Sequence, residues 1–330
     1  MHRTQPALST HTKGEIKILS LSEAEVKTCI DLRKLLDALA DGFKALSDGR
    51  VVNPARPQLD IPNAGYSLAM PAWMKGMHLT VKLVNVFEGN IARGMPSHLA
   101  TIHLFDPETG IPVCIMDGTY ITAVRTSGSA ILSVRELARR NVKVATVVGA
   151  GVQASQHLRL LPLVRDFQEI RVFSKDFADA QALASRHSGV TAVEDLEEAI
   201  LSSDVVCLAT HSYVPAISAE WVQPGTHVSS VGVAPPGGEL PIDLMARGTL
   251  FVETRDAFAP TPVGCCELAN IDPAAGTDLG AMLLGQRPGR TSDQQITIYK
   301  AMGVAMEDMV TADLAYREAK RLGVGQAVSL

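Results

Sequence analysis

A glycine-containing segment gives the clearest chemical signal in the chain. Residues 143–148 form a short β-branched run of the kind found in buried parallel strands, and Gly149-Ala-Gly-Val-Gln-Ala154 follows at once. In a dinucleotide-binding unit the first glycine permits a tight turn, the second lets the backbone approach a pyrophosphate, and a small third residue lets helix pack on strand. Unpaired N–H groups at the start of the next helix would also attract phosphate. The segment therefore predicts Gly149 and Gly151 as cofactor-binding residues, with a purely structural turn as the alternative.

The residues after the next predicted strand bear on the choice of cofactor. An acidic residue at the end of that strand, residues 169–173, would bind the ribose 2′-hydroxyl of NAD(H). Ser174 and Lys175 stand there instead, and a hydroxyl with an ammonium group can bind the 2′-phosphate of NADP(H). Asp176 is a counter-indication, unless it caps the following helix. The sequence therefore predicts NADP(H) as the preferred cofactor, with NAD(H) as the alternative.

Three basic residues outside the glycine segment are candidates for binding a carboxylate. Arg56 lies between two prolines, Lys82 interrupts an apolar run, and Arg125 lies in a predicted helix. Arginine can hold a carboxylate in a bidentate fork, so three such cations facing one cleft would bind an amino acid or a keto acid. A buried cation is costly without an anionic partner, so the alternative for Lys82 is a structural ion pair. The alternative for Arg56 is a solvated surface position.

The elements that must position these residues fall into two groups. In the second half, strand-like runs alternate with helical or turn segments; the runs cover residues 143–148, 169–173, 204–210, 226–231 and 249–253. This alternation predicts an α/β fold, a Rossmann-type doubly wound parallel sheet. In the first half, a helical stripe over residues 31–46 precedes predicted strands at residues 16–19, 66–72, 78–87, 99–105 and 113–116 in a β-rich α+β domain. A helix over residues 119–139 would join the two, and residues 298–322 carry apolar side chains at helical spacing up to Gly323.

Composition bounds the class of protein. The chain has 330 residues, enough for two domains, with 46% hydrophobic and 20% charged residues, an ordinary globular balance. A net charge of −5 gives no reason to expect nucleic acid or an anionic membrane as a partner. We expect no membrane span and no signal peptide, with residues 1–14 as a disordered lead-in. The five cysteines are scattered without a CxxC pair, so we expect a cytoplasmic protein with no disulfide framework and no metal site.

Several motifs, in one order, resemble the ornithine cyclodeaminase/mu-crystallin family. They are Lys82-Leu-Val-Asn85, Gly94-Met-Pro-Ser-His98, Leu104-Phe-Asp-Pro-Glu-Thr-Gly110, Met116-Asp-Gly-Thr119, Ile121-Thr-Ala-Val-Arg-Thr126, Gly149-Ala-Gly-Val-Gln153 and Gly303-Val-Ala-Met-Glu-Asp308. The resemblance implies a homodimer with two domains per chain. A discontinuous substrate-binding and dimerisation domain would comprise residues 1–124 and 301–330, and a Rossmann dinucleotide-binding domain residues 125–300.

The resemblance also implies roles for single residues. Arg56, Lys82 and Arg125 would hold the substrate carboxylate, with Lys82 and Arg125 as catalytic residues, and Met302 would lie near the nicotinamide or the substrate. The implied cofactor-binding residues are Ser97, Thr126, Val152, Gln153, Ser174, Lys175, Thr210, Val231 and Gly232. His98 is a candidate proton relay, with a hydrogen-bonded structural histidine as the alternative.

One departure from the family pattern bears on the reaction. Ornithine cyclodeaminases carry an aspartate shortly after the strand-end glycine, whereas this chain has Ala234 there. Since alanine can neither bind an amine nor accept a proton, the resemblance implies an NAD(P)H-dependent reductase of a small cyclic ketimine carboxylate, such as pyrroline-2-carboxylate or piperideine-2-carboxylate. The alternatives are an alanine-like amino-acid dehydrogenase, an ornithine cyclodeaminase that uses another carboxylate, and a mu-crystallin-like protein that binds NADPH and a ligand without turnover.

Overall fold

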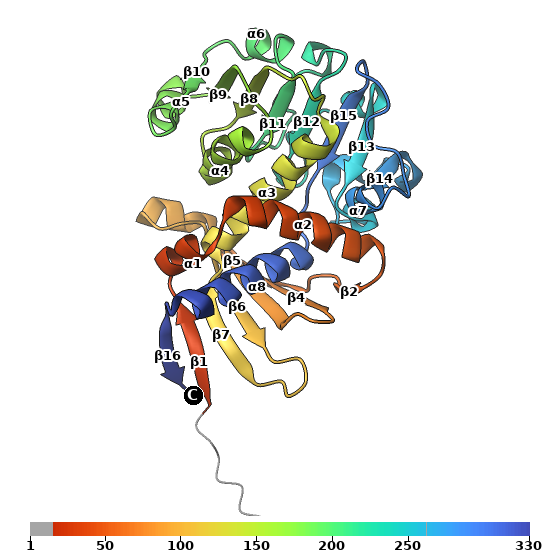
Figure 1. Cartoon of the computed structure of the whole chain (residues 1–330). Coiled ribbons are helices and arrows are strands. Elements are labelled where there is room, and N and C mark those ends of the chain that lie inside the picture. Colours follow the sequence, from red (N-terminus) through yellow and green to blue (C-terminus); the bar gives the residue numbers. More distant parts are fainter. Residues whose placement is uncertain (1–15, 262) are drawn as a thin grey trace, which may run out of the picture.

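The computed structural model of the chain describes residues 16–261 and 263–330. Two eight-stranded sheets lie one above the other, with helices packed between and around them (Figure 1). The predicted lead-in over residues 1–14 lies outside the described residues. Within the described ranges, no helix combines the length and the apolar character needed to cross a membrane.

The first sheet is largely antiparallel and contains strands from both ends of the described chain. Its strands are β1 (Lys17–Leu21), β2 (Val51–Val52), β3 (Gln58–Ile61), β4 (Gly65–Met74), β5 (Leu79–Val86), β6 (His98–Phe105), β7 (Pro112–Asp117) and β16 (Gln326–Ser329). Their order is β16-β1-β7-β6-β5-β4-β2, with β3 paired to β4 and β1 parallel to β7. The sequence predicted β1 and β4 to β7 but missed β2, β3 and β16. β2 has only two residues, and every residue of β3 and β16 is exposed, so no apolar alternation marks these strands.

Helices from distant parts of the chain pack against this sheet. They are α1 (Glu23–Cys29), α2 (Leu32–Ser47), α3 (Thr119–Leu137) and α8 (Ala305–Leu322). Helix α8 contacts β4, β5 and β6 as well as the other three helices. Because side chains alternate along β5, Lys82 points to the buried side beneath α8, whereas Leu83 is exposed on the opposite face.

The second sheet is entirely parallel. Its strands are β8 (Val144–Val148), β9 (Glu169–Phe173), β10 (Val190–Ala192), β11 (Val205–Leu208), β12 (His227–Ser230), β13 (Gly248–Val252), β14 (Gly276–Asp278) and β15 (Ile296–Lys300), in the order β10-β9-β8-β11-β12-β15-β13-β14. The helices α4 (Val152–Leu160), α5 (Phe177–Ala184), α6 (Leu196–Leu201) and α7 (Leu279–Leu283) belong to the same half. The strand order reverses between β8 and β11, which confirms the doubly wound Rossmann-type sheet and marks the edge where ligands bind in such folds.

The predicted helical character of residues 298–322 was wrong at its start. Residues 296–300 form β15, and the helix α8 begins only at Ala305. All five residues of β15 are buried, and a strand buried on both faces has a continuous apolar run that resembles a buried helix segment. Gly303, with φ of 78°, lies in the turn between the two elements. Met302 and Gly303 therefore lie where the chain passes from the second sheet back to the first.

Candidate active site

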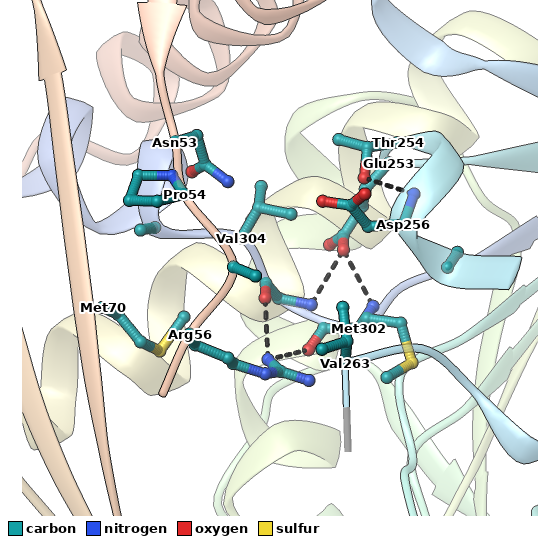
Figure 2. A pocket seen from close by; sticks show the side chains of 14 residues that line it. Asn53, Pro54, Arg56, Met70, Glu253, Thr254, Asp256, Val263, Met302 and Val304 are labelled. Atoms are coloured by element: carbon teal, nitrogen blue, oxygen red, sulfur yellow. Dashed lines mark hydrogen bonds between the residues drawn. The ribbon is translucent and has the colours of Figure 1, made fainter. Parts of the chain in front are cut away.

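A small open pocket lies beside the turn between β15 and α8. Its walls come from the loop before β3, from residues that follow β13, and from the turn itself (Figure 2). Arg56 and Glu253 are among the charged side chains that line it. The pocket thus combines a cation and a carboxylate at the junction of the two sheets.

Arg56 and Glu253 bind the same turn, Arg56 through the turn's carbonyl oxygens and Glu253 through the turn's N–H groups. Nη1 of Arg56 donates to the carbonyl oxygens of Met302 (3.1 Å) and Gly303 (3.0 Å), as Figure 2 shows. Oε2 of Glu253 accepts from the backbone N–H groups of Met302 and Gly303, each at 2.8 Å. These bonds place the predicted substrate residues Arg56 and Met302 side by side at the pocket.

Arg125 reaches the same turn from beneath α8, and both it and Lys82 are paired with carboxylate groups of α8. Nζ of Lys82 lies 2.7 Å from Oδ2 of Asp308. Arg125 donates from Nε to Oδ1 of Asp308 (3.0 Å) and from Nη1 to Oε2 of Glu307 (2.7 Å). Both cations are almost fully buried, and burial lowers the pKa of Lys82 to about 8 although Asp308 favours its charged form. The structural ion pair considered for Lys82 is therefore present.

Gly303 shows how closely Arg125 approaches the turn. A Cβ atom at Gly303 would lie 2.6 Å from Nη1 of Arg125, and the residue's φ of 78° also disfavours a side chain. The guanidinium group of Arg125 and that of Arg56 therefore meet the same residue. The structure brings the three predicted cations together, as the proposed carboxylate site requires.

The carboxylates of this cluster were missed as functional residues. Glu307 and Asp308 lie in the first turn of α8, where acidic residues are ordinarily explained by the helix dipole. Glu253 is the residue that ends a buried apolar strand run. An acidic residue at an otherwise apolar position was the available signal, but only the fold shows that all three face cations.

In the described part of the chain, no group of His, Cys, Asp and Glu side chains is arranged to hold a metal ion.

The glycine loop has the geometry that the sequence predicted. Gly149 has a φ of 120°, and a Cβ atom there would lie 2.4 Å from the carbonyl oxygen of Ala209. Gly151 precedes α4 and a Cβ on it would meet nothing within 4 Å, while Val152 is 67% exposed. The start of α4 is thus open to a ligand at the switch point, and these residues fit a dinucleotide.

Gln153 and the residues after β9 complete this part of the edge. Oγ of Ser127 donates to Oε1 of Gln153 at 2.7 Å, which ties α4 to α3. Directly after β9, Ser174 is half-buried and Lys175 is exposed. The carbonyl oxygen of Phe173, the last residue of β9, accepts from the N–H of Gly149 at 2.8 Å. Asp176 caps α5 through a bond from the N–H of Ala178, as predicted.

Ser97 and Thr126 lie on the side of the first sheet. Ser97 immediately precedes β6, and its Oγ lies 3.0 Å from Nδ1 of His98. Burial lowers the pKa of His98. Thr126 lies on α3, next to Arg125, and is half-buried.

A buried carboxylate that the sequence did not indicate organises the other side of the cofactor edge. Glu239 is fully buried and accepts bonds from donors after β11 and β12. Those donors are Thr210 N (2.6 Å), Thr210 Oγ1 (2.7 Å), Ser230 Oγ (2.9 Å), Val231 N (3.1 Å) and Gly232 N (2.6 Å). Three predicted cofactor residues, Thr210, Val231 and Gly232, therefore share one carboxylate. The preceding Pro-Pro-Gly-Gly loop has no periodic pattern, so local sequence could not place Glu239 there.

Lys300 balances the charge of this second cluster. Its Nζ lies 2.9 Å from Oε1 of Glu267 and donates to Oγ of Ser230 (3.0 Å) and the carbonyl of Gly232 (2.6 Å). Cys265 is buried and donates its thiol hydrogen to Glu267. The edge of the sheet at β11 and β12 is therefore held by a buried polar network.

Comparisons with known proteins extend these observations. The model of the ornithine cyclodeaminase/mu-crystallin family matches residues 16–322. The ketimine reductase mu-crystallin of Mus musculus is 33% identical over 285 residues, which cover 85% of this chain and 90% of that protein.

Two solved structures share the fold. The first is the structure of Δ1-pyrroline-2-carboxylate reductase from Thermococcus litoralis in complex with NADH and L-proline. It superposes with a TM-score of 0.88 at 30% sequence identity, and the match covers 94% of this chain and 100% of the reductase chain. An archaeal alanine dehydrogenase dimer with bound NAD has a TM-score of 0.85 at 29% identity, with coverage of 94% and 99%.

Proposed function

This chain belongs to the ornithine cyclodeaminase/mu-crystallin family, and we propose that it is an NAD(P)H-dependent reductase of cyclic ketimine carboxylates, of the pyrroline-2-carboxylate or piperideine-2-carboxylate type. The observation that carries the proposal is that Arg56 and Arg125 meet at the turn that leaves the nucleotide-binding sheet, while Lys82 shares Asp308 with Arg125. Three cations at that point suit a substrate with a carboxylate beside the reacting carbon.

The residues of the chain position the substrate, and a bound reduced nicotinamide would supply the hydride. Arg56 lines the pocket with its guanidinium held by two backbone carbonyls, so it can present a preorganised donor to a carboxylate. Lys82 and Arg125 lie behind it and are oriented by Asp308 and Glu307. We propose that these three cations form the carboxylate clamp.

The position of the absent aspartate supports reduction over cyclodeamination. Ala234 is 2% exposed in the loop after β12, and its carbonyl accepts from the N–H of Gly237 at 3.1 Å. A methyl group there offers no base and no anion to the side-chain amine of ornithine, whereas a ketimine has already closed its ring.

A substrate panel tests the proposed function. We expect NAD(P)H oxidation with pyrroline-2-carboxylate or piperideine-2-carboxylate that is independent of ammonia, and no conversion of ornithine to proline with NAD. Reduction of pyruvate that requires ammonia would instead establish the alanine-dehydrogenase alternative. Tight NADPH binding without turnover of any imino or keto acid would establish a non-catalytic binding protein.

For the cofactor, we propose a preference for NADP(H) carried by Lys175. Replacing Lys175 with alanine should weaken NADPH binding by about tenfold, because an exposed charge-assisted hydrogen bond to the 2′-phosphate is worth roughly 1.5 kcal/mol. NADH, which lacks that phosphate, should change by less than about twofold. Fluorescence titration of both cofactors measures this, with Lys175→Arg as the charge-preserving control. Equal losses for NADPH and NADH would contradict the assignment.

We also propose that residues 1–124 and 301–330 form one domain and residues 125–300 the other. The contacts of α8 with β4 to β6 and the pairing of β16 with β1 support the discontinuous unit. Limited proteolysis that released a stable fragment ending between α8 and β16 would contradict this division.

A homodimer is proposed through the outer face of the first sheet. Leu59, Leu83 and Leu99 are 64%, 40% and 43% exposed there, and strand register places Leu99 opposite Asn85 and Leu83 opposite Thr101. Exposed leucines on neighbouring strands suit an isologous contact, and the archaeal alanine dehydrogenase relative is a dimer. Light scattering that gave only a monomer mass at micromolar concentration would contradict it.

A further inference from the structure

Two buried carboxylates beside the pocket have an oxygen whose bonding is incomplete. Glu253 and Glu307 are 2% and 0% exposed. Oε2 of Glu253 accepts from the N–H groups of Met302 and Gly303. Oε2 of Glu307 accepts from Nη1 of Arg125 and from the N–H of Val304 at 3.1 Å. The Oε1 atom of each finds no hydrogen-bond donor among the described residues.

Glu253 accepts from the N–H of Gly303 and Glu307 from the N–H of the next residue, Val304, so the two carboxylates lie side by side at this turn. Two ionised carboxylates cannot bond, because both only accept. A single proton between them would turn the contact into a hydrogen bond and remove one buried negative charge. The arrangement therefore suits one shared proton when a further negative charge enters the site.

The surroundings of the pair determine how strongly it holds that proton. Arg125 on α3 is paired with Glu307, and the carboxylate of Asp308 on α8 lies near Glu307. Lys82 on β5 lies on the far side of Asp308. Arg56 faces Glu253 from the pocket. Tyr299 on β15 also faces the pair, and burial raises its pKa, so it stays neutral. Burial raises the pKa of Glu307 well above its ordinary value, and the nearby carboxylate of Glu253 raises it further. The pKa of Glu253 is raised as well, chiefly by burial.

The charge count of the cluster changes when a substrate binds. Arg56, Lys82 and Arg125 carry three positive charges, and full ionisation of Glu253, Glu307 and Asp308 would supply three negative ones. A substrate carboxylate would leave one excess negative charge in a mostly buried site, which is costly. Asp308 is bonded to two cations, so its charge is already compensated. The Glu253–Glu307 pair is where an added proton restores neutrality.

We propose that binding of the substrate carboxylate is coupled to uptake of one proton by the Glu253–Glu307 pair, and that Glu253 delivers this proton to the nitrogen of the bound ketimine. This rests on the proposed reductase function. A bound reduced nicotinamide would supply the hydride for the new C–H bond, and the π electrons of the C=N bond would become a lone pair on nitrogen. The nitrogen then forms its N–H bond with the proton from the pair, which is left with both carboxylates ionised. Glu253 is one of the residues that line the pocket (Figure 2).

Proton uptake can be measured without turnover. Pyrrole-2-carboxylate, a planar carboxylate of the ketimine's size, is titrated calorimetrically into the NADP⁺-saturated protein at pH 7.5 in buffers of different ionisation enthalpy. The dependence of the observed heat on that enthalpy gives the number of protons taken up. We expect nearly one proton for the wild-type protein. Binding with no proton uptake would overturn the inference and leave the reductase function intact, whereas absence of binding together with absence of turnover on the ketimine panel would overturn both.

Variants separate the pair from other buried carboxylates. Glu307→Gln keeps the shape and can donate to Glu253, but it cannot share a proton, so uptake should fall to near zero and kcat by about 10²-fold. In the wild type kcat should fall as pH rises and the pair loses its proton, and Glu307→Gln should lose this dependence. Asp313→Asn removes another buried carboxylate of α8, one bonded to His78, and should keep the wild-type uptake and kcat.

The glutamine variants must be folded for this comparison, which thermal denaturation checks. Glu253→Gln provides the second variant if Glu307→Gln does not fold, with the same expected loss of proton uptake. A folded variant of either residue with unchanged proton uptake and an unchanged pH profile would overturn the proposal.

Discussion

Arg125→Ala is expected to lower the free energy of unfolding by about 3–5 kcal/mol, because it leaves Glu307 and Asp308 buried without their main cationic partner. We also expect kcat/KM to fall by about 10²-fold or more, since the turn at Gly303 and the carboxylate clamp lose the same guanidinium group. Urea unfolding and steady-state reduction of the ketimine measure the two effects. A variant as stable as the wild type would show that this buried ion cluster contributes nothing to folding.

Arg56→Ala provides the matched comparison. Arg56 is half-buried and donates to the backbone carbonyls of Met302 and Gly303, so its loss removes hydrogen bonds to neutral groups. We expect a comparable loss of kcat/KM, of about 10²-fold, but a change in unfolding free energy of less than about 1.5 kcal/mol. Near-normal turnover in this variant would exclude the pocket as the substrate site.

Glu239→Ala is expected to destabilise the protein by about 3 kcal/mol or more and to abolish measurable dinucleotide binding. Its removal takes the acceptor from the buried hydroxyl of Ser230 and from the half-buried donors of Thr210, Val231 and Gly232. Each fully buried donor left without an acceptor costs roughly 1–3 kcal/mol, and the costs are not additive. The charge of Lys300 would also lose part of its compensation. The peptide groups after β11 and β12 would then no longer be held at the ligand-binding edge of the sheet.

Glu239→Gln tests positioning with a smaller loss of stability. The glutamine amide keeps one accepting oxygen. Its NH₂ group replaces the second carboxylate oxygen and cannot accept from the donors that this oxygen binds in the wild-type protein. NADPH affinity should fall by about tenfold or more in a fluorescence titration, while the protein stays folded. Glu220→Gln, at an exposed carboxylate of the same half of the chain, should change neither quantity. Unchanged NADPH affinity in folded Glu239→Gln would show that this carboxylate does not position the cofactor edge.

Locally encoded features were predictable from the sequence. The strand before Gly149, the turn and the start of α4 follow from a β-branched run and from the conformational freedom of glycine. The capping box of Ser22 and Glu25 and the N-cap at Asp176 depend on neighbours within three residues. These features depend only on residues close together in the sequence, so they can be predicted without knowledge of the fold.

The sequence by itself determined β1 and β4 to β7 of the first sheet, β8, β9 and β11 to β13 of the second, and the nucleotide-binding turn. It also indicated three basic residues as candidates for the substrate site. Only the tertiary structure decided that Lys82 and Arg125 are paired with Asp308, and that Glu253 faces Glu307, because these partners come from distant elements and no local pattern links them. It also decided that residues 296–300 are a strand, since burial on both faces erases the periodicity that separates strand from helix. The electrostatic character of the site therefore arises from packing, which brings unlike charges into a volume that excludes water.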